Sequence, residues 1–132
     1  MTEIVIIMGS RSDLPQAEKI AAALARYGLK GQMRVASAHK SPAHLLRLLD
    51  EYESRDAPPS VYITIAGRSN ALSGMVDAAV GAPVIACPPY SDKFGGADVF
   101  SSLRMPSGVA PALVLEPEAA ALLAAKILGR RR

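Results

Sequence analysis

Three short polar loops interrupt an otherwise apolar chain, and the first of them has the residue types of an anion site. Gly9–Asp13 joins a small-residue turn and two serine hydroxyls to the start of a predicted helix. A helix N-terminus carries partial positive charge and unpaired backbone N–H groups, which suit a phosphate or carboxylate. The loop matches no nucleotide-binding fingerprint, so a simple connection in which Ser12 or Asp13 caps the helix is the alternative. Beside a phosphate, Asp13 would accept hydrogen bonds from ribose hydroxyls.

The second loop, Ser37–Lys40, places a histidine between Ala38 and Lys40. A histidine at the end of a strand is well placed for proton transfer near neutral pH. The alternative for His39 is a structural role, with its ring nitrogens satisfied by neighbouring groups. The other histidine, His44, is expected on the solvent side of the following helix.

The third loop, Gly67–Asn70, adds a second cation to the same set. Lys40 and Arg68 are opposed only by Asp13, so the three loops together favour an anionic small molecule such as a phosphate ester. Arg68 could instead pair with a neighbouring subunit, and Asn70 could simply cap the next helix. No carboxylate pair and no Cys/His spacing indicates a metal site.

A repeated strand–helix pattern must position these loops. Strands are predicted over residues 4–8, 32–36, 61–66, 84–87 and 112–115. Helices are predicted over 14–27, from Pro42 onward, over 71–80 and over 118–128, with a short helical piece at 98–103. Asp13 and Ser41 are the expected N-caps of the first two helices. Their expected apolar faces consist of Leu14, Ala17, Ile20, Ala21 and Leu24, and of Leu45, Leu46, Leu48 and Leu49.

This pattern predicts an α/β fold, a three-layer doubly wound parallel sheet of the flavodoxin-like kind with strand order 2-1-3-4-5. In that order strands 2, 1 and 3 are neighbours, and the winding reverses between them. Ligands bind outside the carboxyl ends of the strands at such a point. The three polar loops are therefore expected to converge on one crevice.

The chain of 132 residues fits one domain, expected over residues 1–129, with a basic tail at 130–132. The formal net charge of +3 equals the three terminal arginines, so we expect a neutral body and no nucleic-acid partner. The single cysteine, Cys87, is expected to be buried and inert. With neither a signal peptide nor a membrane span apparent, a cytoplasmic setting is expected. Residues 119–125 are apolar nearly all round, which favours burial against another subunit.

Five strings in this sequence resemble one enzyme family closely. The resemblance, which runs from residue 4 to about residue 128, is to the catalytic subunit of phosphoribosylaminoimidazole carboxylase, the PurE family of purine biosynthesis. The resemblance rests on five motifs: Met-Gly-Ser-Arg-Ser-Asp at 8–13, Ser-Ala-His-Lys at 37–40, Ala-Gly-Arg-Ser-Asn at 66–70, Cys-Pro-Pro at 87–89 and Ser-Ser-Leu-Arg-Met-Pro-Ser-Gly at 101–108.

Two departures from the mutase branch of that family point to its second branch. The mutases rearrange N5-carboxyaminoimidazole ribonucleotide, and they usually have Arg where this chain has Lys40 and a histidine in the third loop. This chain has Arg68, Ser69 and Asn70 there instead. The resemblance therefore implies the animal-like class II carboxylases, lyases that join CO₂ directly to 5-aminoimidazole ribonucleotide (AIR) and give 4-carboxy-AIR (CAIR).

The resemblance also assigns roles to residues. It implies that Ser12, Ser37 and Lys40 hold the 5′-phosphate and Asp13 the ribose, while His39 moves the proton at C4 of the imidazole. The loop Gly67–Asn70 would line the imidazole and CO₂ end. The substrate-binding residues implied are Gly9, Ser10, Ser12, Asp13, Ser37, Ala38, Lys40, Gly67, Arg68, Ser69 and Asn70, with His39 catalytic.

The reaction implied is reversible and uses no ATP, biotin, metal or other cofactor, because aminoimidazole is an electron-rich enamine. Family members are homo-oligomers, tetramers or octamers, and many continue past the fifth helix with an extension that contacts neighbouring subunits. Two alternatives remain: the mutase activity, and a non-catalytic nucleotide- or phosphate-binding module on the same fold.

Overall fold

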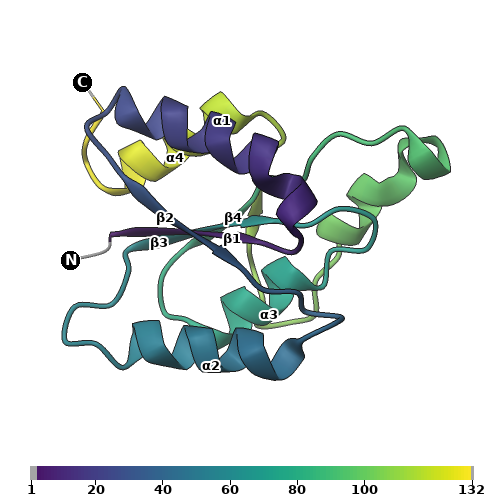
Figure 1. Ribbon diagram of the computed structural model, residues 1–132, viewed down its shortest axis with the longest axis horizontal. Helices are drawn as coiled ribbons and strands as arrows, with labels where there is room; N and C mark the ends of the chain where they lie inside the picture. Colours follow the sequence, from purple (N-terminus) through teal and green to yellow (C-terminus); the bar gives the residue numbers. More distant parts are fainter. Residues whose placement is uncertain (1–2, 132) are drawn as a thin grey trace.

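A five-stranded parallel sheet forms the middle layer of the structure, a computed structural model that describes residues 3–131 (Figure 1). The strand order is β2-β1-β3-β4-β5, so the predicted flavodoxin-like topology is confirmed. The strands are β1 (Ile4–Met8), β2 (Gly31–Val35), β3 (Val61–Ile65), β4 (Val84–Ala86) and β5 (Ala112–Leu113).

Helices cover both faces of this sheet. In Figure 1, α1 and α4 lie together on one face, and α2 and α3 lie on the other. The α-helices are α1 (Leu14–Ala25), α2 (Pro42–Glu53), α3 (Leu72–Ala79) and α4 (Pro117–Ile127), and two 3₁₀ segments are η1 (Arg11–Asp13) and η2 (Lys93–Ser102). No helix among residues 3–131 is both long and apolar enough to cross a membrane.

The central strand β1 belongs to two apolar cores at once. All five of its residues are buried, as a strand covered on both faces requires. Ile4, Ile6 and Met8 pack in the core beneath α1 and α4, whereas Val5 and Ile7 pack in the core beneath α2 and α3. This alternation follows the two-residue period of a strand. Burial on both sides fixes the strand, and with it the loop that follows Met8.

The first two helices start where predicted, at Leu14 and Pro42, but their N-caps lack the expected hydrogen bond. Asp13 and Ser41 make no side-chain capping hydrogen bond. The chain first forms η1, which Ser10 caps by accepting a hydrogen bond from the Ser12 N–H at 3.2 Å. The Ser41 hydroxyl donates to the Ser37 carbonyl at 3.3 Å instead. The predicted positions of both caps are therefore confirmed, whereas neither side chain makes a capping hydrogen bond.

Two predicted core leucines lie at the surface. Leu14 is 43% exposed and Leu46 is 49% exposed, while the rest of both predicted faces is buried or half-buried. Leu14 is the first residue of α1. His44 is exposed on α2, as predicted.

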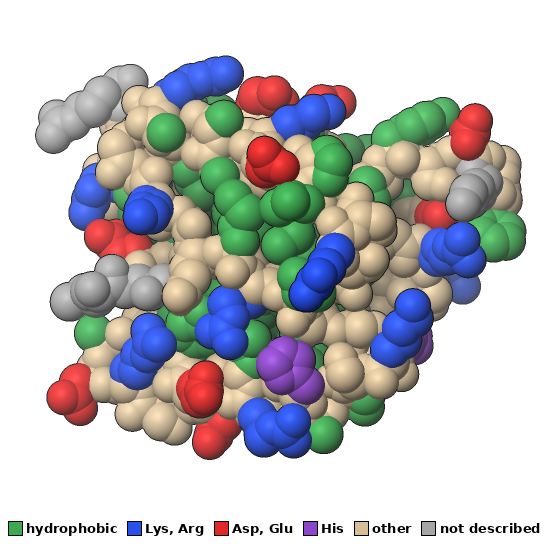
Figure 2. All heavy atoms as spheres, in the orientation of Figure 1, with side chains coloured by type: hydrophobic (Ala, Val, Ile, Leu, Met, Phe, Trp, Pro, Cys, Tyr) green, Lys and Arg blue, Asp and Glu red, His purple; other side chains and the backbone are tan. Residues whose placement is uncertain are grey.

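The segment η2 projects from the side of the fold (Figure 1). It starts five residues earlier than the helix expected at 98–103. It begins at Lys93, and Phe94, Gly95 and Gly96 inside it have positive φ angles that break the helix. Exposed large apolar side chains gather on and around this segment, namely Tyr90, Phe94, Phe100 and Leu103. Figure 2 shows hydrophobic side chains projecting at this end of the molecule.

The apolar helix α4 is largely buried within the single chain. Ala120, Ala121 and Ala124 are fully buried, whereas Ile127 is 40% exposed. The apolar surface expected on this helix is thus small. The expected basic tail begins at Arg130, whose guanidinium lies 3.2 Å from the Glu3 carboxylate, and Arg132 lies outside the described residues.

Lys and Arg side chains are spread among acidic ones on the face in Figure 2 rather than gathered into one patch. The excess of three positive charges therefore has no single location on that face.

Candidate functional site

A cleft of about 630 Å³ opens at the carboxyl ends of β1, β2 and β3. The three polar loops form it, as the predicted topology requires. Its lining consists of Gly9, Ser10, Ser12, Asp13, Ser37, Ala38, His39, Lys40, Ala66, Gly67, Arg68, Ser69 and Leu72. Eleven of the twelve predicted site residues are in this set, and Asn70 is not.

The first loop is folded by its own hydroxyl groups. The Ser10 and Ser12 oxygens are 2.9 Å apart and share a hydrogen bond. The Asp13 N–H donates to the Ser10 carbonyl at 3.1 Å, which closes the turn. Gly9 is held from the other side, since its N–H donates to the Ile65 carbonyl at 2.9 Å. The loop therefore presents two serine hydroxyls and a carboxylate to the cleft from a fixed backbone.

The second loop is a tight turn that exposes its two basic side chains. The Ser37 hydroxyl accepts a hydrogen bond from the Lys40 N–H at 3.1 Å, and the Ser37 carbonyl accepts one from the Ser41 N–H at 3.1 Å. His39 and Lys40 are both exposed at the cleft. This turn leads directly into the N-terminus of α2, whose dipole adds positive potential beside Lys40.

The third loop is attached to η2, a connection that the sequence did not predict. The Asp98 carboxylate accepts a hydrogen bond from the Arg68 N–H at 3.2 Å. The Ser101 hydroxyl accepts one from the Asn70 N–H at 2.8 Å. Arg68 has a φ of 55°, which is unusual for a residue with a side chain. The loop is thus held in an unfavourable conformation from outside the cleft.

Asn70 is buried behind the third loop and does not line the cleft. Its side chain is buried, with the amide donating to the Ser102 hydroxyl at 2.9 Å. Its carbonyl oxygen accepts from the Ser73 N–H at 3.1 Å, so the alternative that it caps the third helix agrees with the structure. The Ser73 hydroxyl is in turn 2.7 Å from the Thr64 hydroxyl. This buried network ties β3, α3 and η2 together.

The charges in the cleft are unequal. Lys40 and Arg68 contribute two cations, and Asp13 contributes the carboxylate. Partial burial raises the pKa of the Asp13 carboxyl, and a hydrogen bond to the Ser10 main chain opposes that effect. A partly desolvated carboxylate gains from hydrogen-bond donors, and the vicinal hydroxyls of a ribose are donors of that kind.

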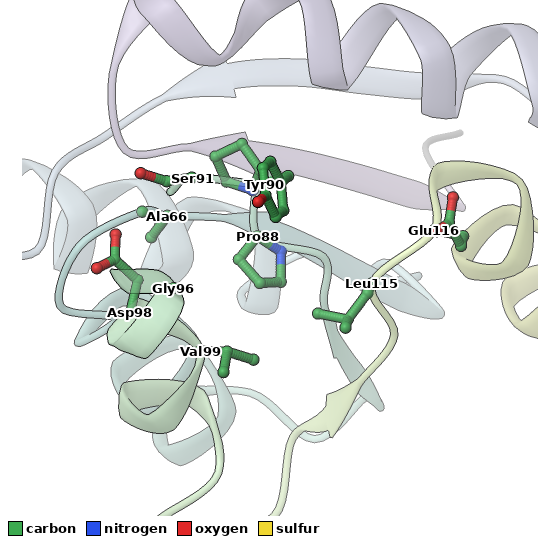
Figure 3. Close-up of a pocket in the computed structure, with 11 residues that line it drawn as sticks. Ala66, Pro88, Tyr90, Ser91, Gly96, Asp98, Val99, Leu115 and Glu116 are labelled. Atoms are coloured by element: carbon green, nitrogen blue, oxygen red, sulfur yellow. The ribbon is translucent and has the colours of Figure 1, made fainter. Parts of the chain in front are cut away.

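A second, smaller pocket of about 270 Å³ lies next to the cleft and shares Ala66 and Gly67 with it. Figure 3 shows Pro88 at its centre, with Val99 of η2 and Leu115 on facing sides. Sequence reasoning missed this pocket, and it also missed Ala66 and Leu72 in the cleft. The position of Ala66 at the end of a strand was the one available signal.

Cys87 lies at the end of β4, outside both cavities, and it is buried as predicted. Burial raises its pKa to about 11, and the carboxylates of Glu116 and Glu118 add to the rise while a hydrogen bond from Gln16 opposes it. The thiol is therefore protonated at neutral pH. Among residues 3–131, no three His, Cys, Asp or Glu side chains are grouped as a metal site would need.

Comparison with known proteins identifies the family. Residues 3–132 match the family described as AIR carboxylase. The phosphoribosylaminoimidazole carboxylase of Archaeoglobus fulgidus is 64% identical over 123 residues, which are 93% of this chain and 67% of that protein. The human bifunctional phosphoribosylaminoimidazole carboxylase/succinocarboxamide synthetase is 46% identical over 126 residues, which are 96% of this chain and 29% of that larger protein.

A solved structure agrees with these matches. The crystal structure of Treponema denticola PurE has a TM-score of 0.92 and 57% identity to this chain, and the match covers 98% of this chain and 81% of that one. The chain belongs to the AIR carboxylase family of purine-biosynthesis enzymes.

Proposed function

We propose that this protein joins CO₂ to C4 of AIR and forms CAIR reversibly in de novo purine biosynthesis, without ATP, biotin or a metal ion. The observation that carries the proposal is the cleft itself. It brings His39 together with two hydroxyl-bearing loops, two cations and one carboxylate at the point where the sheet winding reverses.

The phosphate and ribose of AIR would occupy the end formed by the first two loops. Ser12, Ser37 and Lys40 supply hydroxyl donors and a positive charge for the 5′-phosphate. Asp13 accepts hydrogen bonds from the ribose hydroxyls, which stabilises its partly buried carboxylate. Binding energy from this end holds the imidazole against CO₂, which converts an encounter of two molecules into a step within one complex.

The reaction at C4 needs only one group that transfers a proton. The electron pair of the C4–C5 double bond of AIR forms the new bond to the carbon of CO₂. One C=O π bond of CO₂ breaks as its electron pair moves onto oxygen, so the CO₂ unit becomes a carboxylate. The adduct then carries a positive amidinium group and still holds a proton on C4. Neutral His39 takes that proton, and the double bond returns. In the reverse direction protonated His39 returns the proton to C4, and CO₂ leaves.

Two features favour CO₂ over the mutase reaction. The chain has Lys40 in the second loop and Arg68-Ser69-Asn70 in the third, which resemble the CO₂-using branch. Animal relatives named for phosphoribosylaminoimidazole carboxylase match 96% of the chain at 45–46% identity. The mutase activity on the N5-carboxylated ribonucleotide is the second candidate, since it uses the same fold and cleft.

We place the reaction in a homo-oligomer in the cytoplasm, with residues 1–129 as one domain and 130–132 as its tail. His39 and Lys40 are exposed in the single chain, while the reaction needs water excluded from the CO₂ end. A neighbouring subunit over the cleft would supply that exclusion.

Substitution of the two histidines separates an enzyme from a binding module. His39→Asn is expected to lower kcat for carboxylation by about 10²–10⁴-fold while the Kd for AIR stays within about threefold. His44→Asn is the matched control, because His44 is exposed on α2 and does not line the cleft. AIR binding by both proteins without any turnover by the wild type would support the binding module instead.

A further inference from the structure

The third loop begins as a thin wall between two cavities. Ala66 and Gly67 line the cleft on one side and the apolar pocket on the other. In Figure 3 the pocket separates Ala66 and Asp98 from Leu115. A Cβ built on Gly67 would meet only the Pro89 ring, at 3.7 Å, which is ordinary van der Waals contact. Close packing therefore does not fix the position of this segment.

The loop also adopts a conformation that it would not take unaided. Arg68 has a φ of 55°, in the left-handed region that is unfavourable for a residue with a side chain. Such a conformation persists where the surroundings hold it. The surroundings in this case are the Asp98 carboxylate on the Arg68 N–H and the Ser101 hydroxyl on the Asn70 N–H.

The Ser101 hydroxyl is itself oriented for this role. It donates to the Asp98 carbonyl at 2.8 Å, which directs its lone pairs toward the Asn70 N–H. One turn of η2 therefore binds the loop at two points, two residues apart. Asp98 and Ser101 are both half-buried, so they can be substituted without opening the core.

We infer that Asp98 and Ser101 are positioning residues that hold the Gly67–Asn70 loop against the imidazole and CO₂ end of the substrate. The inference rests on the proposed function, since it assigns the loop to the reacting end of AIR. Neither side chain touches the substrate. They act through the backbone of the loop. In this way η2 supports a cleft that is formed at the ends of β1, β2 and β3.

The test compares Asp98→Ala, Ser101→Ala and the double variant with the conservative changes Asp98→Asn and Ser101→Thr. The conservative variants keep an acceptor for each N–H. Asp92→Ala and Ser107→Ala are matched controls, because Asp92 caps η2 without a side-chain hydrogen bond and both side chains are exposed.

The double variant is expected to lower kcat about 10–100-fold and to raise the KM for CO₂, because a displaced loop misplaces the reacting atoms. The KM for AIR should stay within about threefold, since phosphate and ribose bind to the other loops. Hydrogen–deuterium exchange of residues 66–71 should quicken in the alanine variants, whereas the conservative and control variants should resemble the wild type in every measurement.

An unchanged kcat and unchanged exchange in a folded double variant would overturn the inference. So would a rise in the KM for AIR equal to that for CO₂, which would indicate a general loss of structure. Failure of the proposed function is a separate outcome, because it appears as absent carboxylation by the wild type. The exchange measurement still tests the attachment of the loop in that case.

Discussion

At the scale of single residues, Asp13 is held where its charge is costly. Burial raises the pKa of this carboxyl in the folded protein above the value it has in the unfolded chain. The folded state therefore loses stability as the pH rises from the unfolded value, near 3.8, through the folded one. A residue that weakens the fold and lines a cleft is typical of a binding site.

Asp13→Asn is accordingly expected to stabilise the ligand-free protein at pH 7 and to weaken AIR binding about tenfold. The gain in melting temperature over the wild type should grow from pH 4 upward and then level off, since only the wild type carries the titrating group. Melting curves between pH 4 and 7 and the Kd for AIR check both parts. Equal stability across that range would contradict the assigned burial, and unchanged affinity would contradict the ribose contact.

Most residues of the cleft could be predicted from the sequence because they belong to short polar loops. Ser12, Asp13, His39 and Lys40 stand out because polar side chains follow apolar strands. Asn70 was expected in the cleft and lies beneath it, because a buried amide takes the partners that its surroundings offer, here Ser73 and Ser102. Asp98 could not be found from the sequence, since its contact with Arg68 spans 30 residues and depends on where η2 folds back.

At the scale of elements, the pairing of β2 with β1 depends on Gly31. A Cβ at this position would lie 2.7 Å from Cδ1 of Ile6 and 3.3 Å from Cδ1 of Leu24. The edge strand β2 thus approaches the core more closely than a side chain allows. Because β2 carries the Ser37–Lys40 loop at its other end, this packing also sets the distance of His39 from the first loop.

Gly31→Ala is expected to lower the free energy of unfolding by about 1–3 kcal/mol, the usual cost of overpacking. Gly81→Ala is the control, because a Cβ there meets nothing within 4 Å and Gly81 does not need a positive φ. It should change stability by less than about 1 kcal/mol. Urea denaturation of both variants measures the difference, and equal midpoints would show that β2 can move away without cost.

The order of the elements and most of their ends followed from the repeated pattern, whereas η2 did not. The strands match the prediction to within two residues at each end, because apolar runs mark what the sheet buries. The first two helices start at Leu14 and Pro42 as predicted, but Asp13 and Ser41 make no capping hydrogen bond, and a serine one turn earlier closes each loop. The break at Phe94, Gly95 and Gly96 within η2 depends on a conformation that the loop composition alone does not specify.

At the scale of the whole molecule, apolar surface is concentrated away from the helix expected to carry it. Ala120, Ala121 and Ala124 of α4 are buried within the chain. Phe94 is 70% exposed and Leu103 is 56% exposed, at the end of the fold formed by η2. The segment that holds the third loop thus also carries strongly exposed large apolar side chains, the kind of surface that a neighbouring subunit would cover.

Sedimentation velocity is therefore expected to show a tetramer or octamer, and Phe94→Ser with Leu103→Ser should shift it toward smaller species. The same double variant should lose carboxylation in proportion to the loss of assembly, because water then reaches the CO₂ end. Leu46→Ser is the control, because Leu46 is also an exposed leucine but belongs to α2 instead of η2. A fully active monomer would contradict the placement of the site at a subunit contact.

Whether the protein takes its one-carbon unit from CO₂ is decided by a two-substrate assay. Purified protein is given AIR with bicarbonate-derived CO₂ in one reaction and the N5-carboxylated ribonucleotide in another, both without ATP, and CAIR formation is followed. Rapid CAIR formation is expected from AIR and CO₂, and none from the N5-carboxy compound beyond what its released AIR and CO₂ supply. Efficient turnover of the N5-carboxy compound with none of AIR and CO₂ would contradict this expectation and assign the cleft to the mutase reaction.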